Sequence, residues 1–258
     1  MQQQPLSTMS GKIAIVTGAS RRQGIGAAIC RALAAQGADI FFTHWRAYDQ
    51  AMAYADHGGP DTLLQELVTR GVRAEGLEID LSAGDAYRTV LDMAQTRLGA
   101  PAILVNNAAH STRDGYLRLD AATLDAHYAV NIRAMALLSV EFARRYGGTS
   151  ARRIINLSSG QSVEPMPEEL AYVATKGAVE AFTRTLAAEV AAKGITVNAV
   201  DPGATDTGWM SEEVKARILS TMAFGRLGQP EDAARLIAFL AGDAGAWITG
   251  QVIHSRGA

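Results

Sequence analysis

One stretch near the start of the chain constrains the fold most: an apolar run, a glycine-rich turn and a helical pattern follow one another directly. Residues 12–17 read KIAIVT, a continuous apolar run that is typical of a strand covered on both faces. The turn contains Gly18, Gly24 and Gly26, and it leads into AAICRALAAQG, a helical pattern that ends at Gly37. Glycines let a backbone approach a pyrophosphate, and a helix N-terminus offers free N–H groups. This order therefore predicts a phosphate-binding turn, whereas isolated glycines would indicate only a turn without a ligand.

The alternation of strand and helix continues along the rest of the chain. Further strand patterns read ADIFFTHW, VRAEGLEID, PAILVNNAA, RRIINLSS, GITVNAV and WITGQVIHS, with helical patterns between them. This alternation predicts an α/β fold: a doubly wound, Rossmann-type parallel sheet of about seven strands with helices on both faces. The chain shows no repeat or second-domain boundary, so we expect one catalytic domain over residues 11–258 after a flexible tail at 1–10.

Two segments interrupt this rhythm. Residues 45–60 look like a loop inserted between the second strand and its following helix, and long connections of this kind are often functional. Within it, His57 has no partner at metal-ligand spacing, so we expect a surface histidine and no metal site. Residues 204–225 contain a short helical pattern, WMSEEVKARILSTM, and are predicted to form a lid over the substrate.

Composition excludes several classes of protein. The 258 residues carry 24 Lys and Arg against 26 Asp and Glu, a formal net charge of −2, so no basic surface for nucleic acid or an anionic membrane is expected. No run of about 18 apolar residues suggests a membrane span, and the start lacks the pattern of a signal peptide. Cys30 is the single cysteine and lies among small apolar helix residues, which favours a core position over a nucleophile. A cytoplasmic protein is expected.

A second constellation predicts proton chemistry. Tyr172 and Lys176 stand at positions i and i+4 of a helical pattern, AYVATKGAVEAFTRTLAAEVAA, and so share one face of the helix. A lysine ammonium beside a phenol favours the phenolate, so we expect a lowered pKa for Tyr172. Ser159 lies at the end of the strand pattern RRIINLSS, where its hydroxyl can reach the same volume. The pair alone is also a common surface arrangement, but together with the phosphate-binding turn it suits holding a carbonyl or alcohol oxygen during proton transfer.

The end of the second strand bears on the choice between NAD(H) and NADP(H). An acidic residue at this position usually holds the ribose 2′-hydroxyl of NAD, but here the strand ends at His44 and Arg46 with no carboxylate until Asp49. Arg21 and Arg22 stand in the glycine-rich turn, and a guanidinium favours a 2′-phosphate. NADP(H) is therefore the preferred prediction and NAD(H) remains possible, because the arginines can also be solvated loop residues.

Taken together, these motifs resemble those of the short-chain dehydrogenase/reductase family, over about residues 10–257. The closest resemblance is to 3-oxoacyl-acyl-carrier-protein reductase-like members. The matching positions are the turn from Thr17 to Gly26, Asp80, Asn106-Asn107-Ala108, Asn131, Ser159, Tyr172, Lys176 and Pro202-Gly203 with Thr207.

The resemblance implies interconversion of a carbonyl and a secondary alcohol by hydride transfer, on a small ketone or a 3-oxoacyl thioester. It implies that Tyr172 is the general acid/base, that Ser159 polarises the carbonyl, and that Lys176 lowers the phenol pKa and holds the nicotinamide ribose. It further implies that the backbone of Asn131 holds a water connecting Lys176 to solvent. A homo-oligomer, a tetramer or a dimer, is expected.

The positions predicted to contact the cofactor come from the glycine-rich turn, the strand ends and the catalytic helix. They are Gly18, Ser20, Arg21, Arg22, Gly24, Ile25, Gly26, His44, Arg46, Asp80, Leu81, Asn107, Ala108, Tyr172, Lys176, Pro202, Gly203, Thr205 and Thr207. The substrate pocket is predicted to be lined by His110, Gln161, Ser162, Val163, Met166, Trp209 and Met210.

The chain also departs from the family pattern. Five residues stand between Gly18 and Gly24 where three are usual, and Ala109 replaces the last glycine of the Asn-Asn-Ala-Gly motif. Near the C-terminus, Ser255-Arg256-Gly257 replaces the usual Asp-Gly-Gly, in a region that often reaches a neighbouring subunit. Two other functions stay open: an NAD-dependent dehydrogenase working oxidatively, and a cofactor-binding regulatory protein, against which the complete catalytic set argues.

Overall fold

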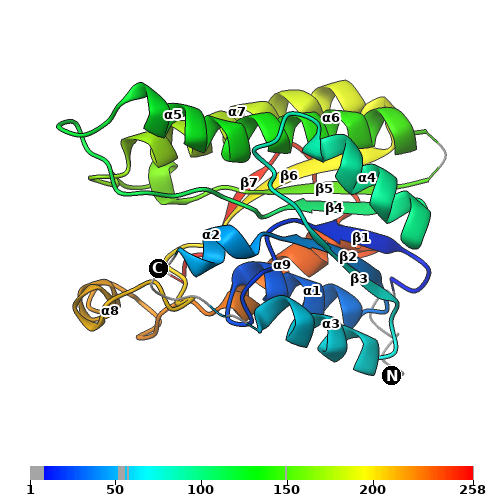
Figure 1. Cartoon of the computed structure of the whole chain (residues 1–258), viewed down its shortest axis with the longest axis horizontal. Helices are drawn as coiled ribbons and strands as arrows, with labels where there is room; N and C mark the ends of the chain where they lie inside the picture. The colour runs from blue at the N-terminus through cyan, green and yellow to red at the C-terminus, as the bar shows by residue number, and fades with distance from the viewer. Residues whose placement is uncertain (1–8, 52–55, 57, 149, 258) are drawn as a thin grey trace.

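The centre of the molecule is a seven-stranded parallel sheet with the strand order β3-β2-β1-β4-β5-β6-β7 (Figure 1). The computed structural model describes residues 9–51, 56, 58–148 and 150–257. The strands are β1 Ile13–Val16, β2 Asp39–His44, β3 Ala74–Glu78, β4 Ile103–Asn106, β5 Arg152–Leu157, β6 Ile195–Asp201 and β7 Val252–His254. The doubly wound parallel sheet predicted from the alternation of patterns is confirmed.

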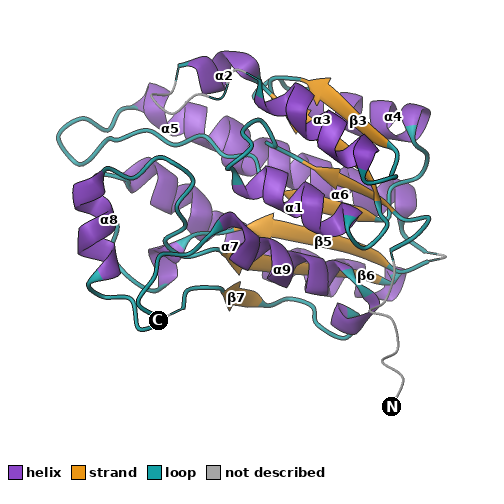
Figure 2. Ribbon diagram, turned by 90° about the horizontal axis from the view of Figure 1, so that it is seen from below, coloured by secondary structure: helices purple, strands orange, loops and turns teal. Residues whose placement is uncertain are grey.

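Helices cover both faces of this sheet (Figures 1 and 2). One face carries α1 Ile25–Ala34, α3 Gly59–Thr69 and α9 Pro230–Ala241; the other carries α4 Ala86–Arg97, α5 Ala121–Tyr128, the π-helix η1 Ala129–Ala134, α6 Met135–Tyr146 and α7 Leu170–Val190. The remaining short elements are α2 Arg46–Gln50, η2 Gly160–Ser162, η3 Ala191–Lys193, α8 Glu212–Leu219 and η4 Asp243–Gly245.

Strand β1 shows why its sequence is apolar at every position. Ala14 and Val16 pack into the core cluster beneath α1 and α9, whereas Ile13 and Ile15 pack into the cluster on the opposite face. Successive side chains of a strand point to opposite faces, so a central strand needs apolar residues throughout.

The strand order reverses between β1 and β4, and the loops that follow these two strands meet at that point. The backbone N–H of Asn107 donates to the Thr17 hydroxyl at 3.0 Å, and its side-chain amide donates to the carbonyls of Thr17 and Gly18 at 2.8 and 2.9 Å. Asn107 thus ties the glycine-rich turn to the end of β4. Ligands of open parallel sheets bind at such a reversal, outside the carboxyl ends of the strands.

Several boundaries differ from the sequence-based expectations. Met9, placed in the predicted tail, is fully buried, and its N–H donates to the carbonyl of Gln36. The inserted segment contains the short helix α2, and His57 lies outside the described residues. The last strand is limited to Val252–His254 and is shorter than its apolar pattern. Within the described part of the chain, no helix is long and apolar enough to span a membrane.

Asn131 lies in the π-helix η1 Ala129–Ala134, which interrupts the long helix between α5 and α6. A π-helix leaves part of the regular hydrogen-bond ladder unmade, and such segments occur frequently at functional sites. The side chain of Asn131 is buried in this segment. It accepts from the N–H of His110 at 2.7 Å and donates to the carbonyl of His110 at 2.9 Å and to the hydroxyl of Thr175 at 3.0 Å.

Candidate active site

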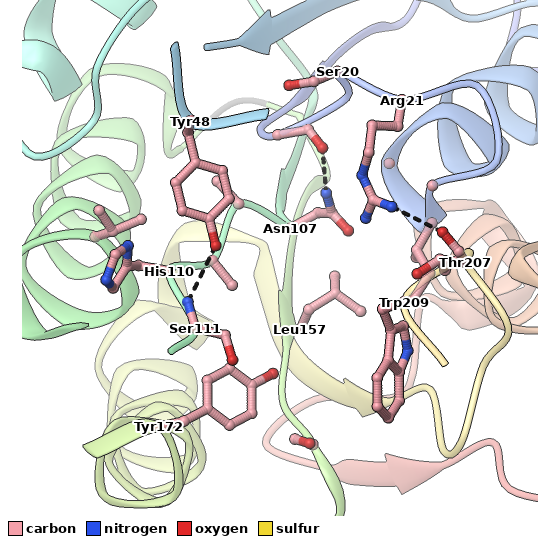
Figure 3. Close-up of a pocket in the computed structure, with 18 of the residues that line it drawn as sticks. Ser20, Arg21, Tyr48, Asn107, His110, Ser111, Leu157, Tyr172, Thr207 and Trp209 are labelled. Atoms are coloured by element: carbon pink, nitrogen blue, oxygen red, sulfur yellow. Dashed lines mark hydrogen bonds between the residues drawn. The ribbon is translucent and has the colours of Figure 1, made fainter. Parts of the chain in front are cut away.

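A cavity of about 580 Å³ opens at the carboxyl edge of the sheet (Figure 3). Its walls come from the glycine-rich turn, the ends of β2 to β5, the helices α2 and α7, and the loop after β6. Of the predicted positions it is lined by Gly18, Ser20, Arg21, Gly24, Ile25, Gly26, His44, Asp80, Leu81, Asn107, Ala108, His110, Ser159, Met166, Tyr172, Lys176, Pro202, Gly203, Thr205, Thr207 and Trp209.

Three groups predicted to do the chemistry come together in this cavity. Ser159 follows β5, and its hydroxyl lies close enough to the phenol of Tyr172, on the first turn of α7, to lower the pKa of that phenol. Lys176 lies one turn further along α7; its buried ammonium is 5.5 Å from the centre of the Tyr172 ring and donates to the Leu157 carbonyl at 2.7 Å. The end of β5 and the first turns of α7 therefore fix two hydroxyls and one ammonium within one small volume.

Burial dominates the proton affinities of these groups. Desolvation raises the pKa of Tyr172 to about 12, against the smaller lowering effect of the nearby Ser159 hydroxyl. Desolvation also lowers the pKa of Lys176 to about 8. The expected net lowering of the pKa of Tyr172 is therefore wrong in this structure. The physical reason is that the ammonium donates to the Leu157 carbonyl, while burial and the carboxylate of Glu169 both disfavour the phenolate.

The start of the catalytic helix is held by a residue that the sequence did not single out. The buried carboxylate of Asp114, in the loop after β4, accepts from the N–H groups of Leu170 and Ala171 at 2.8 Å each, and also from the N–H of Gly115. These bonds lower the pKa of Asp114 against the effect of burial. Asp114 thereby satisfies the free N–H groups of α7 immediately before Tyr172.

We expect Asp114→Ala to lower the free energy of unfolding by about 2 kcal/mol, because it leaves buried N–H groups without an acceptor. Urea unfolding followed by circular dichroism measures the change. Asp120→Ala is the matched control, because Asp120 caps the exposed start of α5 by accepting from Thr123 at 2.8 Å. An equal loss in both variants would contradict the role given to Asp114.

A buried carboxylate on α7 holds the turn that carries Ser159. Glu180 accepts from the hydroxyl of Ser158 at 2.7 Å, the amide of Gln161 at 2.6 Å and the hydroxyl of Ser162 at 3.1 Å. Gln161 and Ser162, which were predicted to line the substrate pocket, bond to Glu180 instead and are absent from the cavity wall. Two further predicted substrate contacts, Val163 and Met210, are likewise absent from the cavity wall.

The glycine-rich turn is closely fitted to its surroundings. A Cβ atom on Gly18 would lie 2.6 Å from the Cα of Ala108, and one on Gly26 would lie 2.6 Å from the Gly18 carbonyl oxygen. Gly24 at the N-cap of α1 has no side chain that could cap the helix. The backbone N–H groups of the first turn are therefore free at the end of α1 that lines the cavity. This is the arrangement that binds phosphate at a helix N-terminus.

The ends of β2 and β3 provide polar groups that fit an adenosine ribose. His44 lines the cavity, and its buried Nδ1 has no hydrogen-bond partner among the described residues. Burial lowers the pKa of His44, which favours a neutral ring. Asp80 also lines the cavity, and its carboxylate accepts from the N–H and the hydroxyl of Ser82, both at 2.8 Å. The residues present therefore fit a dinucleotide that extends from this end toward Tyr172.

The arginines expected near the ribose occupy different places. Arg21 lines the cavity, where its guanidinium donates to the Thr207 carbonyl at 2.8 Å and its Nε lies 3.7 Å from the carboxylate of Asp49. Arg22 is exposed and pairs with Asp56, and Arg46 pairs with Asp61 and Glu78. Neither Arg22 nor Arg46 lines the cavity. The predicted cofactor contacts of Arg22 and Arg46 are therefore not supported by the geometry. Both side chains are paired with acidic residues of the inserted segment, α3 or β3 and lie outside the cavity wall.

Fold and site together define a Rossmann-type, nucleotide-dependent oxidoreductase. Sequence comparison gives the same answer: a family model described as enoyl-(acyl carrier protein) reductase matches residues 18–257. The chain belongs to the short-chain dehydrogenase/reductase family.

Individual relatives cover nearly the full chain. An uncharacterized oxidoreductase of Bacillus subtilis, YjdA, is 52% identical over 98% of both chains. A 3-oxoacyl-[acyl-carrier-protein] reductase of Pseudomonas aeruginosa, FabG, is 37% identical over 97% of this chain and 98% of its own. A short-chain dehydrogenase of Burkholderia cenocepacia, solved in complex with NADP, superimposes with a TM-score of 0.86 at 33% identity, covering 96% of this chain and 98% of its own.

Proposed function

We propose that this oxidoreductase is an NADP(H)-preferring enzyme that interconverts a carbonyl compound and a secondary alcohol. The observation that carries the proposal is the meeting of Ser159, Tyr172 and Lys176 in the same cavity as the glycine-rich turn. The 3-oxoacyl-[acyl-carrier-protein] reductases among the relatives support reduction of a 3-oxoacyl thioester or a small ketone.

In the proposed mechanism, the hydroxyls of Ser159 and Tyr172 donate hydrogen bonds to the substrate oxygen. When bound, the nicotinamide supplies the hydride to the carbonyl carbon. Negative charge then develops on the oxygen, and Tyr172 transfers its proton to it; a phenol with a pKa of about 12 carries that proton throughout the neutral range. The ammonium of Lys176 lies beside the resulting phenolate and stabilises it by charge.

The preference for NADP(H) rests on Arg21, which is the one predicted arginine that reaches the cavity among the described residues. The complex of the Burkholderia relative with NADP is consistent with it. Asp49 works in the opposite direction, because its carboxylate lies 3.7 Å from Arg21 and repels a phosphate. Arg21 favours NADP(H) and Asp49 disfavours it, so a substitution of Arg21 tests the preference for NADP(H) over NAD(H).

We expect Arg21→Ala to weaken NADPH binding at least about tenfold and NADH binding much less, because a guanidinium–phosphate contact is worth roughly 1.5 to 3 kcal/mol. Quenching of tryptophan fluorescence during titration with each nucleotide measures both dissociation constants. Arg22→Ala is the matched control and should change neither. Equal losses for NADPH and NADH in Arg21→Ala would show that Arg21 does not recognise the 2′-phosphate.

The function itself is tested with a panel of ketones, aldehydes and 3-oxoacyl thioesters, followed by the absorbance of NADPH. Turnover of at least one carbonyl compound is expected, and the reverse assay with NADP⁺ and the matching alcohol gives the ratio of the two directions. Failure of the whole panel with both NADPH and NADH would contradict the proposal.

We further propose a cytoplasmic homo-oligomer, a dimer or a tetramer. Supporting this, Trp247, in the loop between η4 and the edge strand β7, is 98% exposed, and Phe239 on α9 is 42% exposed. Exposed large apolar side chains are typical of association sites. Light scattering of the purified protein measures the state directly.

A further inference from the structure

The inserted segment reaches the reaction end of the cavity as well as the adenosine end. Helix α2 contributes two neighbouring residues to the wall: Asp49, beside Arg21, and the half-buried Tyr48. Tyr48 lies close enough to Tyr172 for its phenol to raise the pKa of Tyr172. The insertion therefore supplies part of the space where a substrate must lie.

The position of the Tyr48 ring is defined by its neighbours. Its hydroxyl accepts from the N–H of Ser111 at 3.3 Å, and its ring lies 5.6 Å from the ring of His110. The ring of His110 in turn contacts that of His127 edge-on at 4.7 Å. Aromatic pairs at these separations attract each other, so Tyr48 and His110 form a continuous aromatic wall.

The wall rests on a rigid base. His127 is fully buried, and both of its ring nitrogens are used: Nδ1 contacts the Thr123 carbonyl at 2.8 Å, and Nε2 accepts from the N–H of Thr112 at 3.2 Å. The backbone of His110 is held on both sides by the side chain of Asn131. The aromatic wall is thus fixed to the π-helix and to the loop after β4.

A third ring lies across the cavity. The indole N–H of Trp209 donates to the Thr205 carbonyl at 3.2 Å, which fixes the side chain at the cavity wall. Figure 3 shows Tyr48 and His110 on one side with Tyr172 below them, and Trp209 on the other side. A flat group attached to a carbonyl at Tyr172 would meet aromatic surface on two sides.

The charge at this end disfavours an anionic substrate. Arg113 lines the cavity, but it lies 3.5 Å from the carboxylate of Glu168 and 3.8 Å from that of Glu169. Glu169 also lines the cavity, and burial raises its pKa. A carboxylate or phosphate on the substrate would therefore meet an arginine that is already paired and a buried acid.

We propose that the aromatic wall of Tyr48 and His110 makes the enzyme selective for neutral carbonyl compounds whose carbonyl carbon carries a flat aromatic or conjugated group. The inference rests on the proposed function and narrows its substrate from any small ketone or acyl thioester to this class. The inserted helix α2 is then a specificity element, with Tyr48 as its determining residue.

The test compares acetophenone with cyclohexyl methyl ketone, which have similar size but differ in flatness. The ratio of their kcat/KM values is measured with NADPH in the wild type, in Tyr48→Ala and in Tyr48→Phe. The intrinsic reactivities of the ketones cancel when variants are compared. We expect the wild type to favour acetophenone, Tyr48→Ala to reduce this preference about five- to tenfold, and Tyr48→Phe to retain it within about twofold.

A second measurement separates the wall from the cofactor. The dissociation constant of NADPH should be the same in the wild type and both variants. An unchanged ketone ratio in Tyr48→Ala overturns the inference, as does a changed ratio that is accompanied by weaker NADPH binding. If the wild type reduces other carbonyl compounds but not acetophenone, the inference also fails while the proposed function stands. If it reduces none of the broader panel, the proposed function fails.

Discussion

Tyr172→Phe is expected to lower kcat for carbonyl reduction by about a thousandfold and to leave the dissociation constant of NADPH within about a factor of two. General acid catalysis by a positioned side chain contributes roughly 10² to 10⁴ in rate, and the phenol is the group placed to donate the proton. Its hydroxyl lies near that of Ser159, and a pKa of about 12 keeps it protonated in the neutral range. Steady-state kinetics at saturating NADPH measure the loss.

The phenylalanine variant removes one oxygen atom and keeps the ring, so the packing at the start of α7 should persist. Tyr146→Phe, on α6 and outside the cavity wall, controls for the loss of a phenol as such and should keep full activity. Comparable activity of Tyr172→Phe and the wild type would mean that another group donates the proton. Weak NADPH binding together with lost turnover would indicate damage to the cofactor site instead.

The parts of this protein that follow from local sequence were predictable. The central strands are short, largely apolar runs, and the phosphate-binding turn is contiguous in the chain. Tyr172 and Lys176 share a helix face because of their spacing, and the prediction that Ser159 approaches them needed only its place at the end of a strand.

What escaped prediction depends on contacts between distant segments. Asp114 caps a helix that begins 56 residues later, and no pattern in the sequence joins the two. The functional difference among Arg21, Arg22 and Arg46 is set by the acidic partners that reach each one, and these come from the inserted segment, α3 and β3. The predicted direction of the pKa shift of Tyr172 was wrong because the shift depends on burial, which is a property of the whole fold.

Lys176→Met is expected to raise the free energy of unfolding at pH 7 by about 2 kcal/mol while abolishing measurable turnover. The buried ammonium is costly to the fold: its pKa falls from 10.5 to about 8, which corresponds to roughly 3 kcal/mol at 1.36 kcal/mol per pKa unit. Loss of the hydrogen bond to Leu157 reduces this gain in the free energy of unfolding by about 1 kcal/mol. Methionine has a similar length and packs among apolar groups without a charge to desolvate.

The pH dependence of this effect identifies its cause. In the unfolded chain Lys176 keeps its proton until about pH 10.5, whereas in the folded protein it loses the proton near pH 8. Between these values the unfolded state binds more protons, so rising pH stabilises the wild type. The advantage of Lys176→Met should therefore be full below pH 8 and shrink toward pH 10.5. Lys193→Met, at an exposed position, should show neither the gain nor the pH dependence. Urea unfolding of the three proteins at pH 7 and pH 10 measures the free energies of unfolding. An equal gain for Lys176→Met at both pH values would mean that desolvation of the lysine charge is not the cause.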